Sequence, residues 1–163
     1  MSRVSLKNYP RGIRLAAIIL SQDKEEIVLI ERYKNKKHYF VFPGGGLETT
    51  DKNKKEALLR EIKEETNLSV EIISQPYQLN ILGHSQQFFY ICKYLKGNPA
   101  IIGEEKERQN NNNQYAVGWF PVKNLNKITL YPLEIRDWLL DDLAHRRWQK
   151  RKITAPSLEA LKK

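Results

Sequence analysis

Three consecutive glycines at residues 44–46 separate a short apolar segment from a segment with helical periodicity. The apolar segment reads HYFVF and ends at Pro43, which is typical of a strand. Asn53, followed three residues later by Glu56, resembles a capping box and predicts a helix over residues 54–66. Glycine lets a backbone come close to a ligand or a metal ion. A strand, a glycine loop and a helix in this order favour an α/β fold with a binding site at the loop.

The rest of the chain alternates β-branched and aromatic segments with polar turns, which predicts further strands. A second helix is expected at residues 132–147, because Ile135, Leu139 and Leu143 recur at helical spacing. Strands around a central helix, closed by a second helix, indicate one mixed α/β domain over residues 1–163. The predicted strands cover residues 12–20, 27–33, 38–42, 70–73, 77–82, 86–94 and 115–120.

Size and composition limit the class of protein. A chain of 163 residues with a hydrophobic fraction of 40% can bury a core without disulfides. The one cysteine, Cys92, lies in an apolar run and excludes an intramolecular disulfide. The N-terminal segment lacks the apolar core and cleavage site of a signal peptide, and no apolar stretch has membrane length. A soluble, cytoplasmic protein with no membrane partner is therefore expected.

The formal net charge of +9 favours anionic partners such as nucleotides or nucleic acid. The densest basic cluster, residues 145–152, is interpreted as a helix end that frays into a basic tail from about residue 148. Binding of RNA by this cluster is the disfavoured alternative. The sequence leaves open whether the protein is a monomer or a homodimer.

Against this positive balance, the predicted helix concentrates acidic residues. At 100° per residue, Glu61, Glu64 and Glu65 fall within an arc of roughly 100°. Their like-charge pairs each cost about 0.2–0.5 kcal/mol on an isolated helix, which is too little to exclude a solvated acidic face. The neighbouring glycine loop favours a site for a hard dication with bound phosphates, which needs oxygen ligands. The apolar side expected to pack on the sheet comprises Leu58, Leu59 and Ile62.

The glycine loop and the acidic helix together carry a long, gapped motif. Five residues separate Gly46 from position 52, and seven residues separate position 52 from Arg60. The sequence REIKEETNL occupies residues 60–68. With the preceding PGGGLE, this segment resembles the signature of the Nudix hydrolase family. The resemblance implies a Nudix-type α/β/α sandwich, in which helices flank a mixed β-sheet.

Two positions depart from the family signature. Lys52 stands where the family has an acid, although Asp51 is adjacent and a one-residue insertion in the loop would put it in that place. Asn67 replaces the closing glycine, and Asn is the next-best residue for the left-handed position after a helix. Neither departure removes one of the three glutamates.

The resemblance implies a Mg²⁺-dependent pyrophosphohydrolase, with Mn²⁺ as the alternative cation. Glu61, Glu64 and Glu65 would be the metal ligands, helped by a backbone carbonyl of Gly45 or Gly46. The resemblance also places Arg60 and Glu61 in the catalytic centre, where Arg60 would hold Glu61 in position. The expected substrate is a nucleoside diphosphate linked to another group, as in a nucleoside triphosphate, a nucleotide sugar or ADP-ribose.

Further site residues are expected from the same resemblance. Arg32 and Lys37 are candidates for phosphate contact, and Gly45 for close approach of the substrate. A general base, a further ligand or a substrate contact could come from the acidic loop at residues 103–114, with Glu105 as the candidate beside Glu104 and Glu107. The alternative function keeps the fold without the chemistry, as a nucleotide-sensing or RNA-binding module.

Overall fold

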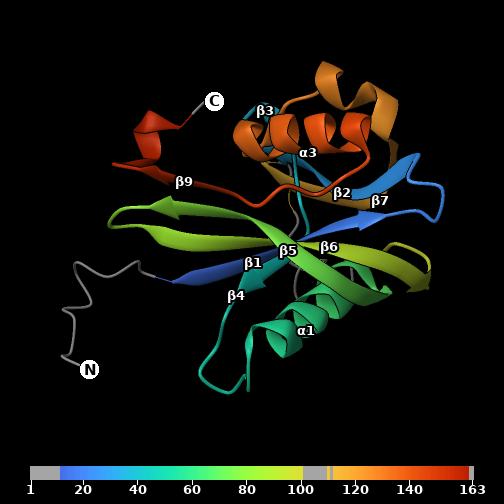
Figure 1. The fold of residues 1–163 in the computed structure, drawn as a ribbon, viewed down its shortest axis with the longest axis horizontal. Coiled ribbons are helices and arrows are strands. Elements are labelled where there is room, and N and C mark those ends of the chain that lie inside the picture. The colour runs from blue at the N-terminus through green and yellow to red at the C-terminus, as the bar shows by residue number, and fades with distance from the viewer. Residues whose placement is uncertain (1–11, 101–109, 111, 162–163) are drawn as a thin grey trace.

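One mixed β-sheet organises the computed structural model, which describes residues 12–100, 110 and 112–161 (Figure 1). The strands follow the order β8-β3-β2-β1-β6-β5-β9, with β4 paired to β1 and β7 to β2. Three pairs are parallel, β1 with β6, β3 with β8 and β5 with β9, and the others are antiparallel. The strands are β1 (Ile13–Leu20), β2 (Glu26–Lys34), β3 (Lys37–Val41), β4 (Gly44–Gly46), β5 (Ser69–Ile81), β6 (Ser85–Lys96), β7 (Asn113–Pro121), β8 (Leu130–Tyr131) and β9 (Arg151–Ala155).

The central strand β1 is buried on both faces, which explains its continuous apolar sequence. Leu15, Ala17 and Ile19 belong to the cluster that includes helix α1 (Lys54–Thr66). Ile18 and Leu20 belong to the cluster that includes helix α3 (Leu133–His145). Alternate side chains of a strand point to opposite faces, so one strand contributes to both cores. Figure 1 shows α1 and α3 on opposite sides of the sheet, and the predicted α/β fold with flanking helices is confirmed.

Helix α1 begins and ends as its sequence predicts. The Asn53 side chain accepts a hydrogen bond of 2.8 Å from the Glu56 N–H, which satisfies one free donor of the first turn. Asn67 adopts the left-handed conformation with φ of 64°, and its N–H bonds the Lys63 carbonyl. The prediction that Leu59 packs on the sheet is wrong. Its side of the helix faces solvent with 43% of the residue exposed, while Ala57, Leu58, Ile62 and Thr66 form the buried stripe.

Two stretches that the sequence left outside its predicted strands belong to strands. The glycine segment β4 pairs with β1, with Leu15 opposite Gly45. The two strands predicted at residues 70–73 and 77–82 are one strand, β5, which runs past Pro76 because its register against β6 shifts on either side of Ser74.

The C-terminal segment corrects another prediction. Helix α3 ends at His145, and Arg146 takes the left-handed position that closes it. The chain then returns as β9 and pairs in parallel with β5, so the segment is not a frayed basic tail. Side chains of β9 alternate between partly buried and exposed, which hides the strand pattern behind the basic composition. Two 3₁₀ segments, Val122–Lys127 and Leu158–Ala160, complete the described elements.

The helices are short. Helices α1 and α3 have 13 residues each, whereas a helix needs about 20 apolar residues to cross a bilayer. In the part of the chain that the structure describes, no helix is long and apolar enough to span a membrane.

Candidate active site

The glycine strand lies against the acidic side of α1. A Cβ atom added to Gly45 would come within 2.3 Å of the Glu61 carboxylate, so any other residue here would displace that side chain. A Cβ on Gly44 would come within 1.9 Å of the Leu15 carbonyl oxygen. The Gly44 N–H donates a hydrogen bond of 2.7 Å to Glu65. Gly45 is therefore required for close approach of the backbone to Glu61, and Gly44 for close approach to the backbone of β1.

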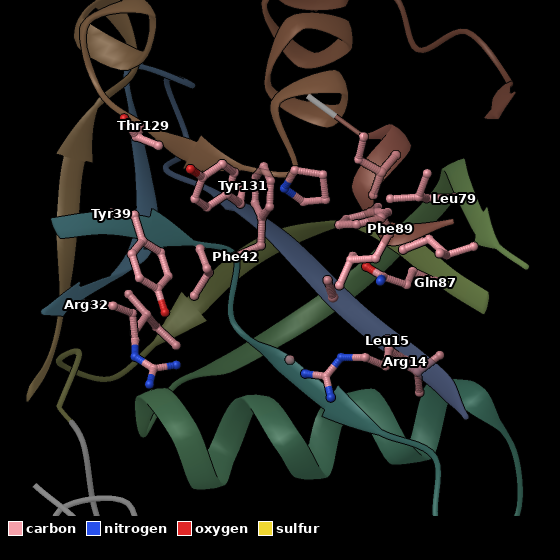
Figure 2. A pocket seen from close by; sticks show the side chains of 18 of the residues that line it. Arg14, Leu15, Arg32, Tyr39, Phe42, Leu79, Gln87, Phe89, Thr129 and Tyr131 are labelled. Carbon is pink, nitrogen blue, oxygen red and sulfur yellow. The ribbon is translucent and has the colours of Figure 1, made fainter. Parts of the chain in front are cut away.

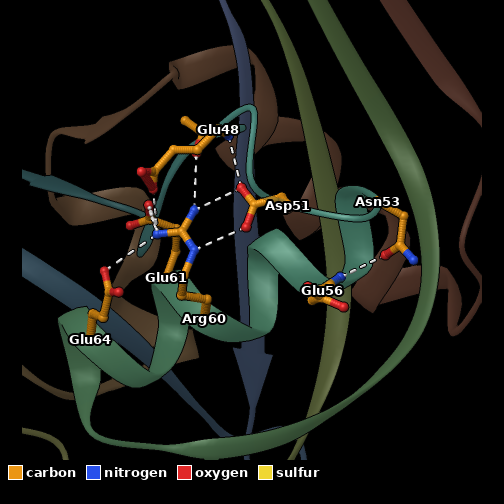
Figure 3. A network of polar contacts seen from close by, with 8 residues as sticks. Glu48, Asp51, Asn53, Glu56, Arg60, Glu61 and Glu64 are labelled. Carbon is orange, nitrogen blue, oxygen red and sulfur yellow. Dashed lines mark hydrogen bonds and ion pairs between the residues drawn. The ribbon is translucent and has the colours of Figure 1, made fainter.

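Arg60 stands at the centre of a network of carboxylates (Figure 3). Its guanidinium contacts Asp51 through two hydrogen bonds of 3.1 and 2.9 Å. One of its terminal nitrogens lies 2.8 Å from Glu48 and 2.9 Å from Glu61, and a longer contact of 3.5 Å reaches Glu64. One cation thus holds four carboxylates, which leaves the cluster with a net negative charge.

The pKa values in this network follow from that imbalance. The hydrogen bonds from Arg60 hold the pKa of Asp51 below its ordinary value. The hydrogen bond to Asp51, and to a smaller extent the one to Glu61, raises the pKa of Arg60. The pKa of Glu61 is raised, because burial disfavours its charged form more than Arg60 stabilises it. A further cation beside Glu61 would favour its charged form.

The first departure from the family signature has a structural explanation. Asp51 rather than residue 52 holds Arg60, and the Asp51 side chain is only 4% exposed. Its second oxygen accepts a 2.8 Å hydrogen bond from the Glu48 N–H, which fixes the loop between β4 and α1. Lys52 is exposed. Asp51 therefore takes the role of the acid that the family signature has one position later.

A pocket of about 720 Å³ opens beside this network (Figure 2). Glu65 and Gly44 line it, so the pocket reaches the acidic side of α1. Figure 2 shows Arg32 and Tyr39 on one side of the space and Leu79 and Phe89 on the other. The other lining residues are Arg14, Leu15, Ala16, Ile30, Lys37, His38, Val41, Phe42, Ile81, Gln87, Tyr115, Thr129, Tyr131, Pro132, Leu158 and Leu161.

Arg32 and Lys37, expected from the sequence to contact phosphate, both line this pocket. The Arg32 guanidinium lies 4.0 Å from the ring centre of Tyr115 and 5.9 Å from that of Tyr39. One of its terminal nitrogens donates a 3.0 Å hydrogen bond to Asn113. Its Nε is buried and has no hydrogen-bond partner among the described residues. The aromatic rings and the amide hold the guanidinium in one orientation, with a donor still unused.

Sequence reasoning missed several pocket residues. Arg14 and Gln87 are neighbours across the parallel pair β1–β6, and both line the pocket. No local pattern marks them, because they are brought together by pairing between distant strands. Leu158 and Leu161 were missed because the C-terminal segment was read as a tail.

The comparisons with known proteins agree with this geometry. The NUDIX domain model matches residues 11–141, which is most of the chain. The chain belongs to the Nudix family of hydrolases. Nudix enzymes hydrolyse pyrophosphate bonds, so the protein is a hydrolase of that class. No curated protein sequence matches the chain significantly.

Solved structures of Nudix proteins share the fold. An ADP-ribose pyrophosphatase from Streptococcus suis matches with a TM-score of 0.59 and 22% identity over 88% of this chain and 98% of that chain. A UDP-X diphosphatase matches with a TM-score of 0.64 and 19% identity over 91% of this chain and 70% of that chain. The MutT protein from Methanosarcina mazei matches with a TM-score of 0.60 and 19% identity over 87% of this chain and 99% of that chain.

The Nudix box of this chain offers a donor set that suits a hard dication. Glu61, Glu64 and Glu65 provide carboxylate oxygens, and the Gly46 carbonyl lies 3.5 Å from Arg60 at the same edge. Within residues 12–100, 110 and 112–161, however, no three acidic, histidine or cysteine side chains converge as a ready metal cluster. Glu61 contacts Arg60 and Glu65 contacts the Gly44 N–H instead. The residues fit a divalent cation by their chemistry and by the raised pKa of Glu61.

The acidic loop predicted to supply a base lies mostly outside the described residues. Glu104, Glu105 and Glu107 all fall within residues 101–109. Their roles stay predictions.

Proposed function

We propose that this Nudix protein is a Mg²⁺-dependent pyrophosphohydrolase that cleaves a nucleoside diphosphate linked to another group. One observation carries the proposal: Glu65 and Gly44 of the Nudix box line the same pocket as Arg14, Arg32 and Lys37. A carboxylate that suits a dication and side chains that suit phosphate oxygens therefore face one space. The whole chain would act as one Nudix domain, either as a monomer or as a homodimer.

The basic side chains would bind the anionic part of the substrate. The pocket lining contains three Lys or Arg side chains, Arg14, Arg32 and Lys37, against one acid, Glu65. Arg32 is already oriented by Tyr115 and Asn113, so little rotamer freedom remains to be lost when it binds phosphate. The Arg32 guanidinium, which lines the pocket, is the proposed donor to a phosphoryl oxygen.

The carboxylates of α1 would hold the cation. Glu61, Glu64 and Glu65, with the Gly46 carbonyl, are the proposed ligands, and Mn²⁺ is the alternative ion. A bound divalent cation supplies charge neutralisation at the phosphoryl oxygens and lowers the pKa of a bound water. Arg60 positions Glu61 through their 2.9 Å contact, and Gly45 leaves the space that the Glu61 carboxylate occupies. Arg60 in turn is held by Asp51.

The comparisons support a nucleotide-type substrate. The similar structures are named an ADP-ribose pyrophosphatase, a UDP-X diphosphatase and a MutT protein. Nucleoside triphosphates, nucleotide sugars and ADP-ribose are therefore the substrate classes to test. They share a pyrophosphate and a nucleoside, and a pocket of about 720 Å³ is within the range of small-ligand sites.

The test measures release of phosphate or nucleoside monophosphate, with Mg²⁺, from one member of each class and from dinucleoside polyphosphates. Glu65→Gln should lower kcat by about 100-fold or more for the preferred class, since the amide keeps the shape and removes the charge. Glu56→Gln is the matched control, because Glu56 lies on the exposed side of the first turn of α1. It should leave kcat unchanged.

Two outcomes would contradict the proposal. Turnover that survives in Glu65→Gln would mean that the box carboxylates do not form the site. A folded protein that turns over no member of the panel would favour the alternative of a nucleotide-sensing or RNA-binding module.

A further inference from the structure

The segment after residue 141 lies outside the part of the chain that matches the NUDIX domain model. It nevertheless reaches the pocket, because Leu158 and Leu161 belong to the pocket lining. This chain therefore adds a wall to the pocket from an element that the matched domain does not include.

The strand β9 places that wall. It pairs in parallel with β5, with Ile153 opposite Leu79 and Ala155 opposite Ile81. The Ala155 carbonyl accepts a 3.0 Å hydrogen bond from Leu82, which extends the pairing to the end of both strands. Leu79 and Ile81 themselves line the pocket, so the chain leaves β9 at the pocket edge.

A buried polar network fixes the start of β9. Arg151 donates to Asp142 at 2.8 Å and also contacts Asp141. Asp142 is 1% exposed and accepts two more hydrogen bonds, one of 2.5 Å from the Tyr77 hydroxyl and one of 3.2 Å from the Gln149 N–H. The position of the C-terminal segment is therefore set by contacts at a buried carboxylate rather than by loose surface packing.

The wall closes the apolar side of the pocket. Leu158 and Leu161 join Leu79, Ile81 and Phe89 among the lining residues. Figure 2 shows Leu79 and Phe89 on the side away from Arg32, with Gln87 beside them. The Gln87 amide donates a 3.0 Å hydrogen bond to Ser85, which holds one polar group at this apolar side.

Leu158 is the most exposed of the four leucines in the pocket lining. It is 37% exposed, whereas Leu15 and Leu79 are almost fully buried and Leu161 is partly buried against the core. Apolar side chains left open at a concave site are typical of ligand contact.

We propose that Leu158 and Leu161 are specificity-determining residues that form the contact surface for the nucleobase of the substrate. The inference rests on the proposed function, because it takes the substrate to be a nucleotide. Of the three parts of a nucleotide, the phosphates belong near Glu65 and the basic side chains, and the sugar is strongly polar. Only the base is planar and apolar enough to pack against leucine and phenylalanine side chains. Gln87 offers a hydrogen bond to the edge of the base.

The experiment compares two ligands that share the anion and differ in the base. Titration calorimetry with Mg²⁺ measures the binding of inorganic pyrophosphate and of the nucleotide that the protein prefers, alongside kcat and KM for that nucleotide. Leu158→Ser and Leu161→Ser should each weaken nucleotide binding by roughly 5- to 20-fold and raise KM, and leave pyrophosphate binding within about twofold. Leu158→Met keeps an apolar side chain of similar size and should bind the nucleotide as tightly as the wild type does.

Leu95→Ser is the matched control, because Leu95 is 53% exposed and does not line the pocket. It should leave both ligands unaffected. The inference is overturned if both pocket variants bind the nucleotide like the wild type, or if they lose nucleotide and pyrophosphate equally, as a structural defect would produce.

The proposed function can fail separately. If Leu158→Ser binds the nucleotide more weakly than the wild type does, but the wild type hydrolyses no substrate, the proposed chemistry is contradicted and the apolar wall is supported. Hydrolysis with unchanged binding in both variants would support the chemistry and contradict the wall. A protein that neither binds nor hydrolyses nucleotides would contradict both.

Discussion

Two arginine–carboxylate networks of this Nudix protein differ in how well donors satisfy their carboxylates. Around Arg60, four carboxylates compete for one guanidinium, and two of them, Glu48 and Glu64, are 58% and 60% exposed. Arg151 pairs with two carboxylates, Asp141 and Asp142, and Asp142 accepts hydrogen bonds from three residues. The first network has unsatisfied negative charge and the second has a saturated buried carboxylate.

The pKa directions express the same difference. Burial raises the pKa of Glu61 more than Arg60 lowers it, so this carboxylate is held at a cost. Burial opposes the ionisation of Asp142 as well, but the hydrogen bonds from Arg151, Tyr77 and Gln149 outweigh it and hold the pKa below its ordinary value. Excess negative charge is what a cation site needs, whereas a satisfied buried carboxylate stabilises the fold. The first network should therefore control activity and the second stability.

The largest expected effect is at Glu61. Glu61→Gln should lower kcat by about 100- to 1000-fold, because it removes a proposed metal ligand at the pyrophosphate. The free energy of unfolding should change by less than about 1 kcal/mol, because the amide oxygen still accepts from Arg60 and a desolvated charge is lost. Steady-state kinetics and urea denaturation of the same preparation measure both quantities. Full activity in this variant would remove the distinction between the two networks.

Asp142 should give the reverse result. Asp142→Asn should lower the free energy of unfolding by about 2–3 kcal/mol, because Arg151 loses its buried partner and the saturated network loses its charge. Under conditions where the variant is folded, kcat at saturating substrate should stay within about threefold of the wild type. Urea denaturation measures the stability.

Asp137→Asn is the control for this change, because Asp137 lies on the same helix and pairs with Arg136, and its side chain is 44% exposed where that of Asp142 is 1% exposed. It should cost less than about 0.5 kcal/mol. A loss of kcat in Asp142→Asn as large as in Glu61→Gln would mean that the C-terminal network belongs to the active site.

The sequence predicts the first network well and the second hardly at all. Asn53, Glu56 and the acidic run of α1 are local signals, since caps and helical periodicity depend on residues a few positions apart. The partners of β9 lie on β5 and on α3, so the ion pairs of Arg151 depend on contacts that no local pattern encodes. The basic cluster at residues 145–152 was therefore read as a surface tail.

Errors at single positions have similar causes. Periodicity alone did not fix which edge of α1 faces the sheet, so Leu59 was placed in the core although it is exposed. The glycines were expected to form a loop, and only the pairing of β4 with β1 shows them as a strand. Spacing aligned Lys52 with the first acid of the family, and the adjacent Asp51, which the sequence offered as its substitute, is the residue that contacts Arg60.

Asp51 tests how precisely the first network must be built. Asp51→Asn should lower kcat by roughly tenfold, because Arg60 loses a charged partner and holds Glu61 less well. Lys52→Glu should change kcat by less than about twofold, since Lys52 is exposed and Asp51 already occupies the place of the acid. Steady-state kinetics of both single variants and the double variant measure this. Rescue of Asp51→Asn by Lys52→Glu would show that residue 52 can reach Arg60, against the geometry of the loop.

The smallest expected effect is at Tyr77, whose hydroxyl donates to Asp142 in the second network. Tyr77→Phe should lower the free energy of unfolding by about 1 kcal/mol at neutral pH, because Asp142 keeps Arg151 and the Gln149 N–H as donors. The pKa of Tyr77 is raised, chiefly by burial, so its phenol stays neutral and able to donate across the acidic and neutral range. Tyr33→Phe, at an exposed tyrosine, is the control and should give no measurable change.

The pH dependence of this difference identifies the acceptor. The pKa of Asp142 is lowered in the folded protein, so the stabilisation it provides is fully present above the unfolded value of about 4 and is lost as pH falls through the folded value. The stability difference between wild type and Tyr77→Phe should therefore be constant from about pH 5 to 8 and decrease below about pH 4. Urea denaturation at a series of pH values measures it. A difference that stayed constant down to pH 3 would mean that the hydroxyl contributes by packing, and that the second network depends less on the Asp142 charge than its geometry indicates.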